Sequence, residues 1–118
     1  MTTQQQLQNL FCLDHNIRVY IPSTNNVNEK TDNAEYIADG LRLFSDLFGG
    51  ATSYDAMGAW LSNSQGVVTE PVKIIESYAT KEATAKGLAK VLEFARRIKS
   101  ELHQEAVSLE YDNKLYFV

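Results

Sequence analysis

The chain has 118 residues, of which 44% are hydrophobic and 22% are charged, as is typical of one globular domain with its own core. Eleven Lys and Arg residues against fifteen Asp and Glu residues give a net charge of −4, which argues against non-specific nucleic-acid binding. The single cysteine, Cys12, cannot form a disulfide within the chain, and no apolar stretch approaches the ~20 residues that span a bilayer. We therefore predict a cytoplasmic protein without membrane contact.

Residues 1–15 are predicted to form an arm outside the domain. Residues 2–8 are polar and rich in glutamine, and the apolar Leu10, Phe11 and Leu13 follow them. This pattern predicts a frayed segment whose apolar end docks elsewhere. The remaining residues, 16–118, are predicted to form a single α+β domain.

The first strand is predicted at residues 17–21, where apolar and mixed residues alternate, and Pro22 ends it. Residues 23–33 then form a loop rich in asparagine. A loop of this length favours a binding loop or disorder about equally.

The first helix is predicted to begin near Asp32, which can form a capping box with Glu35. Four apolar residues then recur at helical spacing and form one buried face: Ile37, Leu41, Phe44 and Phe48. Gly49-Gly50 ends the helix, because glycine adopts the left-handed conformation of a C-cap without strain.

The second half predicts two long strands joined by a hairpin loop, a second helix capped by Thr80, and two short strands. The long strands are predicted at 53–61 and 67–78 with the hairpin loop at 62–66 between them, the helix at 80–103, and the short strands at 106–111 and 115–118. Pro71 cannot donate a hydrogen bond to a neighbouring strand, so the early part of the third strand is predicted at an edge or a bulge.

The order β-α-β-β-α-β with an added strand predicts a ferredoxin-like sandwich, with two helices on one face of an antiparallel sheet. Two helices leave the other face uncovered. Aromatic side chains expected on the sheet make such a face an interface: Tyr20, Tyr54, Trp60 and Tyr78. We therefore predict a homodimer or a higher homo-oligomer.

In this topology, residues 49–52 and 79–81 lie at the same end of the domain. The Gly49 and Gly50 backbone, the Thr52 and Thr80 hydroxyls, the Lys81 ammonium and a helix N-terminus then meet there, a combination that suits a phosphate or carboxylate. Both features are more often simple helix caps, and the lysine-serine or lysine-threonine ending of a P-loop is missing.

Three further residues are candidates for ligand contact. Tyr54 and Trp60 offer rings for stacking, although a lone tryptophan is more often a core or interface anchor. Arg97 usually belongs to a solvated helix face, but in an oligomer it can reach a phosphate on a neighbouring subunit. The predicted ligand-binding set is therefore Gly49, Gly50, Thr52, Tyr54, Trp60, Thr80, Lys81 and Arg97.

Catalytic, metal and cofactor patterns are not apparent in the sequence. His15 and His103 are far apart, and Asp14 and His15 are expected to point to opposite sides of an extended chain. The apolar neighbours of Cys12 make a nucleophilic role improbable. We therefore predict neither a cofactor nor a catalytic residue.

The segment 48–78, FGGATSYDAMGAWLSNSQGVVTEPVKIIESY, resembles small uncharacterised bacterial and phage proteins with a Gly-Gly-Ala-Thr turn, an aromatic strand and a hairpin. It is also similar to the DUF3574 family of small α+β proteins. Phage proteins of this size include oligomeric sponges that sequester nucleotide-derived immune signals. By size and character, the resemblance implies a counter-defence role of that kind, with no catalytic residue to carry over.

Three functions remain open at this point. The leading hypothesis is a non-catalytic, oligomeric protein that sequesters a small anionic, nucleotide-like ligand. The second is a cofactor-independent enzyme with a cavity over the sheet, and the third is an inhibitor or regulator that binds another protein through its exposed face.

Overall fold

The computed structural model describes residues 1–26 and 28–118 and contains three helices and seven strands within that part of the chain. Their bounds, in chain order, are α1 Thr3–Gln8, β1 His15–Pro22, β2 Thr24–Asn25, β3 Glu29–Lys30, α2 Ala34–Phe48, β4 Thr52–Ser62, β5 Gly66–Ala79, α3 Lys81–Glu101, β6 Ser108–Tyr111 and β7 Lys114–Phe117. The predicted α+β class is confirmed. No helix among these is long and apolar enough to cross a membrane.

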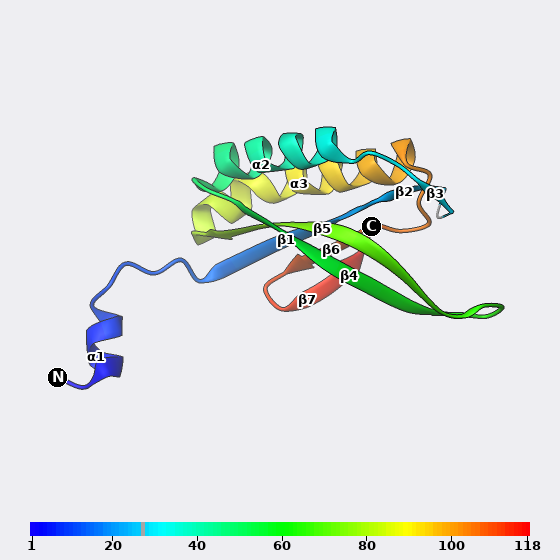
Figure 1. The fold of residues 1–118 in the computed structure, drawn as a ribbon. Helices are drawn as coiled ribbons and strands as arrows, with labels where there is room; N and C mark the ends of the chain where they lie inside the picture. Colours follow the sequence, from blue (N-terminus) through cyan, green and yellow to red (C-terminus); the bar gives the residue numbers. More distant parts are fainter. Residues whose placement is uncertain (27) are drawn as a thin grey trace.

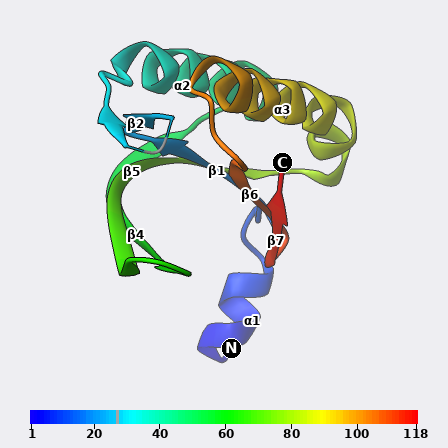
Figure 2. The same ribbon diagram turned by 90° about the vertical axis from the view of Figure 1, so that its right-hand side faces the viewer.

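Five strands form one antiparallel sheet in the order β4-β5-β1-β6-β7. Helices α2 and α3 lie side by side across one face, as Figures 1 and 2 show, and no other element of the described chain covers the opposite face. We call that opposite face the open face. The predicted loop 23–33, of which residue 27 lies outside the described residues, instead contains the small β2–β3 sheet.

The core lies between the two helices and the sheet. Alternate residues of β1 are fully buried there, namely Ile17, Val19 and Ile21, and they belong to the same core cluster as Phe44 of α2. This alternation follows from the two-residue period of a strand, which sends the intervening residues to the open face. The predicted apolar stripe of α2 is confirmed, since its buried or partly buried positions recur at spacings of three and four.

The start of α2 differs from the prediction. The helix begins at Ala34 with Asn33 as its N-cap, and the Asn33 side chain makes no capping hydrogen bond; its amide donates instead to the Pro22 carbonyl oxygen at 2.9 Å. Asp32 accepts only the Ala34 N–H, at 2.9 Å. The capping box predicted for Asp32 and Glu35 is therefore wrong.

The prediction that the arm is frayed is wrong for its first residues. Residues Thr3–Gln8 form α1, which starts with a complete capping box between Thr2 and Gln5. No residue of this helix is buried. Figures 1 and 2 show the arm running away from both layers of the domain.

Strands β4 and β5 extend beyond the rest of the sheet. The last pair between β1 and β5 joins Pro22 to Val72, so residues 66–71 of β5 pair only with β4. We call the part of β4 and β5 beyond this pair the ribbon; it forms the long curved hairpin in Figure 1. Pro71 lies within it, which confirms the predicted edge position.

Candidate functional site

The Gly-Gly turn lies at the end of the sheet where β1 begins, as predicted. The register brings Thr52 opposite Glu76 and His15 opposite Ala79, so both helix–strand connections meet there. A shallow hollow of about 370 Å³ opens at this end. It is lined by Leu13, Phe48, Gly49, Gly50, Ala51, Thr52, Glu76, Ser77 and Tyr78.

Much of the polar capacity of this turn serves the fold. Gly49 has a φ of 93° and donates its N–H to Ser45, so it is the helix C-cap, and Gly50 has no left-handed φ. The Gly50 carbonyl accepts the buried Ser77 hydroxyl at 2.6 Å. The Thr80 hydroxyl accepts the Ala83 N–H at 3.1 Å, which confirms Thr80 as the cap of α3.

The candidate ligand-binding residues therefore separate into groups. Gly49, Gly50 and Thr52 line the hollow, whereas Thr80 and Lys81 stand at the start of α3 and do not line it. Tyr54 and Trp60 lie on β4 at alternate positions that share the open face with Thr52. Their roles in binding stay predictions.

Arg97 lies apart from the other candidates, between the two helices. Its Nη2 pairs with Asp39 at 2.8 Å, and its guanidinium lies 5.3 Å from the centre of the Tyr36 ring. The hydrogen bond to Asp39, partly offset by burial, raises the pKa of Arg97. This residue fastens α2 to α3 within one chain.

The open face carries a row of three charged residues on neighbouring strands, which sequence reasoning missed. Arg18 of β1 lies opposite Glu76 of β5 on one side and Glu110 of β6 on the other. Its Nε pairs with Glu76, and its Nη1 pairs with Glu110 at 2.8 Å. We call these three residues the Arg18 row. It places two carboxylates on one guanidinium, a net charge of −1.

The Arg18 row is partly withdrawn from solvent, although no helix or strand among the described residues covers it. The exposed fractions of the Arg18, Glu76 and Glu110 side chains are 26%, 15% and 21%. Burial alone would lower the pKa of Arg18, but its bonds to Glu110 and Glu76 outweigh burial and raise it. The guanidinium therefore stays charged and holds both carboxylates in place.

Two polar neighbours complete this arrangement. Tyr20 donates its hydroxyl to Glu110, and burial together with this bond raises the pKa of Tyr20 to about 12. The Asn16 amide donates to Glu76 at 3.4 Å. Glu76 also lines the hollow, so the Arg18 row on the open face and the hollow at the end of the sheet share this residue.

The signal for the Arg18 row was present in the sequence but was incomplete. Arg18 and Glu76 each interrupt an apolar strand, and strand alternation sends such residues away from the core. Their meeting depends on strand register, because Arg18 and Glu110 are 92 residues apart. Composition and periodicity do not fix that register.

The predicted orientation of Asp14 and His15 is wrong. Asp14 and His15 do not point apart, because His15 Nε2 lies 3.7 Å from an Asp14 carboxylate oxygen. His15 Nδ1 lies 2.7 Å from the Asp112 carboxylate, in the β6–β7 turn. Cys12 is exposed rather than surrounded by apolar groups. Among the described residues, no three His, Cys, Asp or Glu side chains gather closely enough to hold a metal ion.

Comparison with known proteins gives a structural likeness only. No family model matches the chain, and no curated protein matches it. Among solved structures, a phage SAM lyase in complex with S-methyl-5'-thioadenosine is 17% identical with a TM-score of 0.64, covering 93% of this chain and 92% of its own. The apo state of a phage SAM lyase is 16% identical with a TM-score of 0.59, covering 88% and 87%. The likeness shows the fold.

Proposed function

We propose that this protein binds a sulfonium nucleoside of the S-adenosylmethionine (SAM) type on the open face and cleaves it. The observation that carries the proposal is the Arg18 row, which holds two carboxylates against one guanidinium in a partly desolvated position. The phage SAM lyases of the same fold support the choice of ligand. This proposal replaces a purely anionic ligand with one that carries positive groups.

The excess negative charge of the row suits the two cationic groups of SAM, its sulfonium and its ammonium. Opposite charges within a few ångströms interact more strongly where water is partly excluded. Tyrosine faces add a cation–π attraction. Tyr20 and Tyr54 lie opposite the same residue of β5, Ile74, and so stand in the next row of the same face.

The hollow beside Glu76 suits the nucleoside part of the ligand. Its volume of about 370 Å³ falls within the range of small-molecule sites, which is about 300–1,000 Å³. Tyr78 supplies a ring at its edge, and Thr52 supplies a hydroxyl. Both lie on the open face with Glu76, so one molecule can occupy the hollow and reach the row.

The proposed cleavage breaks the bond between the sulfonium sulfur and the aminobutyryl chain. The carboxylate of the same substrate attacks the chain carbon attached to sulfur and closes a lactone as that carbon–sulfur bond breaks. The bonding electron pair goes to sulfur, which leaves as neutral S-methyl-5'-thioadenosine. No water, oxidant or cofactor is consumed. Both row carboxylates accept charge-assisted hydrogen bonds from other residues of the open face, and this step needs no base. An acidic site also repels the substrate carboxylate and leaves it unpaired for the attack.

We further assign the strands β6-β1-β5-β4 to the ferredoxin-like arrangement, with β7 and the β2–β3 sheet as additions. Support comes from the two strand–helix–strand connections. The β1-α2-β4 connection joins two parallel strands with β5 between them, and the β5-α3-β6 connection joins two parallel strands with β1 between them. In this arrangement the helices occupy the face opposite the Arg18 row. The ligand therefore has access to the row without displacing the core.

The experiment incubates the purified protein with SAM and measures S-methyl-5'-thioadenosine and lactone by mass spectrometry. We expect both products, and we expect Glu76→Gln to lower their rate at least tenfold. The matched control is Glu70→Gln, because Glu70 lies on the same face of β5 but in the ribbon, where it accepts a hydrogen bond from Thr24. SAM that is bound and returned unchanged would support a sequestering protein instead. If the protein neither binds SAM nor turns it over, both the enzyme and the sequestering protein are excluded.

A further inference from the structure

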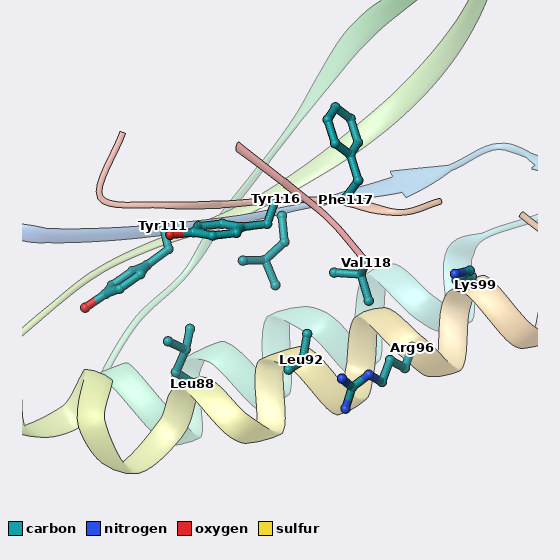
Figure 3. Close-up of a pocket in the computed structure, with 9 residues that line it drawn as sticks. Leu88, Leu92, Arg96, Lys99, Tyr111, Tyr116, Phe117 and Val118 are labelled. Carbon is teal, nitrogen blue, oxygen red and sulfur yellow. The ribbon is translucent and has the colours of Figure 1, made fainter. Parts of the chain in front are cut away.

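A second hollow lies in the helix-covered layer, away from the proposed site. It has a volume of about 690 Å³ and opens between α3 and the β6–β7 edge. Figure 3 shows Leu88 and Leu92 rising from α3 toward Tyr116 and Val118, so its walls are mostly apolar. We call it the α3 groove. A groove of this kind leaves apolar surface in contact with water, which is unfavourable.

Two cations border the α3 groove along the same helix. Arg96 and Lys99 line it one and two turns after Leu92, as Figure 3 shows. Within the described part of the chain, neither takes part in an ion pair. An apolar segment that ends in a carboxylate would match this surface, because its apolar part can lie against the leucines of α3 and its carboxylate against the two cations that follow them.

The N-terminal arm is such a segment. Its residues 1–13 carry no charged side chain, and Asp14 is the first. Leu10 and Phe11 are 63% and 85% exposed, and the Asp14 side chain is 76% exposed. The arm leaves the start of β1 and runs away from the helix layer (Figures 1 and 2), and these apolar side chains stay largely uncovered by the described part of the chain.

We infer that the arm of one copy packs into the α3 groove of a second copy, with Leu10 and Phe11 against the apolar walls and Asp14 beside Arg96 and Lys99. The same chain supplies an unfilled groove and an uncovered segment, and the charges at their ends are opposite. Reciprocal exchange between two copies closes a dimer, whereas one-way exchange closes a ring. The inference uses the helix-covered side of the domain and is independent of the proposed activity.

Cys12 provides a direct test, because it is the single cysteine and lies exposed between Phe11 and Leu13. A photo-crosslinker attached to Cys12 in a mixture of nitrogen-15-labelled and unlabelled protein distinguishes crosslinks between copies from those within one copy. We expect crosslinks between copies that map to α3 and β7. Crosslinks confined to one copy, crosslinks to the open face, or no crosslinks would each overturn the inference.

The charge match gives a second test that does not depend on a chemical label. We expect Asp14→Lys and Arg96→Asp each to weaken self-association in analytical ultracentrifugation, and the double variant to recover it. Phe11→Ser should weaken it about tenfold or more, as expected for loss of a buried aromatic side chain. Lys90→Asp is the matched control, since Lys90 is an exposed residue of α3 outside the groove. A wild-type monomer at 100 µM, or single variants that associate like the wild type, would refute arm exchange. Circular dichroism verifies that every variant is folded.

Discussion

Replacement of Arg18 by methionine tests the most unusual feature of the open face. The variant keeps an unbranched apolar stem but is shorter, and it removes the guanidinium that bonds both Glu76 and Glu110. Glu76 then keeps the hydrogen bond from the Asn16 amide, and Glu110 keeps the hydrogen bond from the Tyr20 hydroxyl. Two carboxylates are left facing each other across β1 without the charge that separates them.

The expected cost follows from how far the row is withdrawn from water. Breaking a fully buried ion pair costs about 3–5 kcal/mol, and an exposed pair is worth at most about 1 kcal/mol. Exposed fractions of 15–26% place the row between these limits. We expect Arg18→Met to lower the free energy of unfolding by about 2 kcal/mol.

The assay is urea denaturation followed by far-ultraviolet circular dichroism, which reports on α2 and α3. Adding Glu76→Gln to Arg18→Met should restore part of the loss, because it removes one of the opposed charges, and the double-mutant cycle isolates this coupling. Arg42→Met is the control, since Arg42 is exposed on α2. A loss below about 0.5 kcal/mol, or no recovery in the double variant, would show that the row is solvated and that the reasoning is wrong.

Three further outcomes are expected from denaturation curves of single variants. Gly49→Ala should cost about 1 kcal/mol, because it forces alanine into a left-handed conformation, whereas Gly50→Ala, with open space around its Cβ, should change stability by less than about 0.5 kcal/mol. Thr80→Ala should cost about 1 kcal/mol through loss of the α3 cap, and an unchanged midpoint would contradict that role. Burial alone would raise the pKa of Asp112, but its hydrogen bonds with His15 and with the Asn16 backbone N–H lower it. The ionised Asp112 carboxylate therefore stabilises the folded state above its ordinary pKa of 3.8. This contribution is lost as pH falls through the lowered pKa of the folded state. Asp112→Asn should therefore be less stable at pH 7 and should flatten the stability profile below about pH 4; equal profiles would contradict the effect.

Most of the element pattern could be predicted from the sequence because it depends on local periodicity and caps. The strand alternation of β1, the Gly49 C-cap and the Thr80 N-cap all act over a few residues. The α1 helix was missed because its capping box, Thr2 with Gln5, lies in a segment with no apolar face. The β2–β3 sheet was missed because two-residue strands carry no periodic signal.

The candidate site was predictable only where it depends on chain order. The sequence was sufficient to place the Gly-Gly turn and the start of α3 at one end of the sheet. It did not indicate that Glu76 enters the hollow or that Glu110 meets Arg18, since both depend on long-range register. The ion pair of Arg97 was not predicted for a related reason: its partner Asp39 lies on the other helix, and only helix packing brings them together.

The ribbon affects how unfolding of this protein is observed. From Met57–Pro71 to Ser62–Gly66, β4 and β5 pair only with each other, whereas β1 is paired on both sides. The amide hydrogens of the ribbon should therefore exchange with solvent well before those of β1. Trp60, the single tryptophan, lies within these pairs. Intrinsic fluorescence therefore follows opening of the ribbon, while circular dichroism follows the helices. A fluorescence transition at lower urea than the dichroism transition would record this local opening as a separate, measurable free energy.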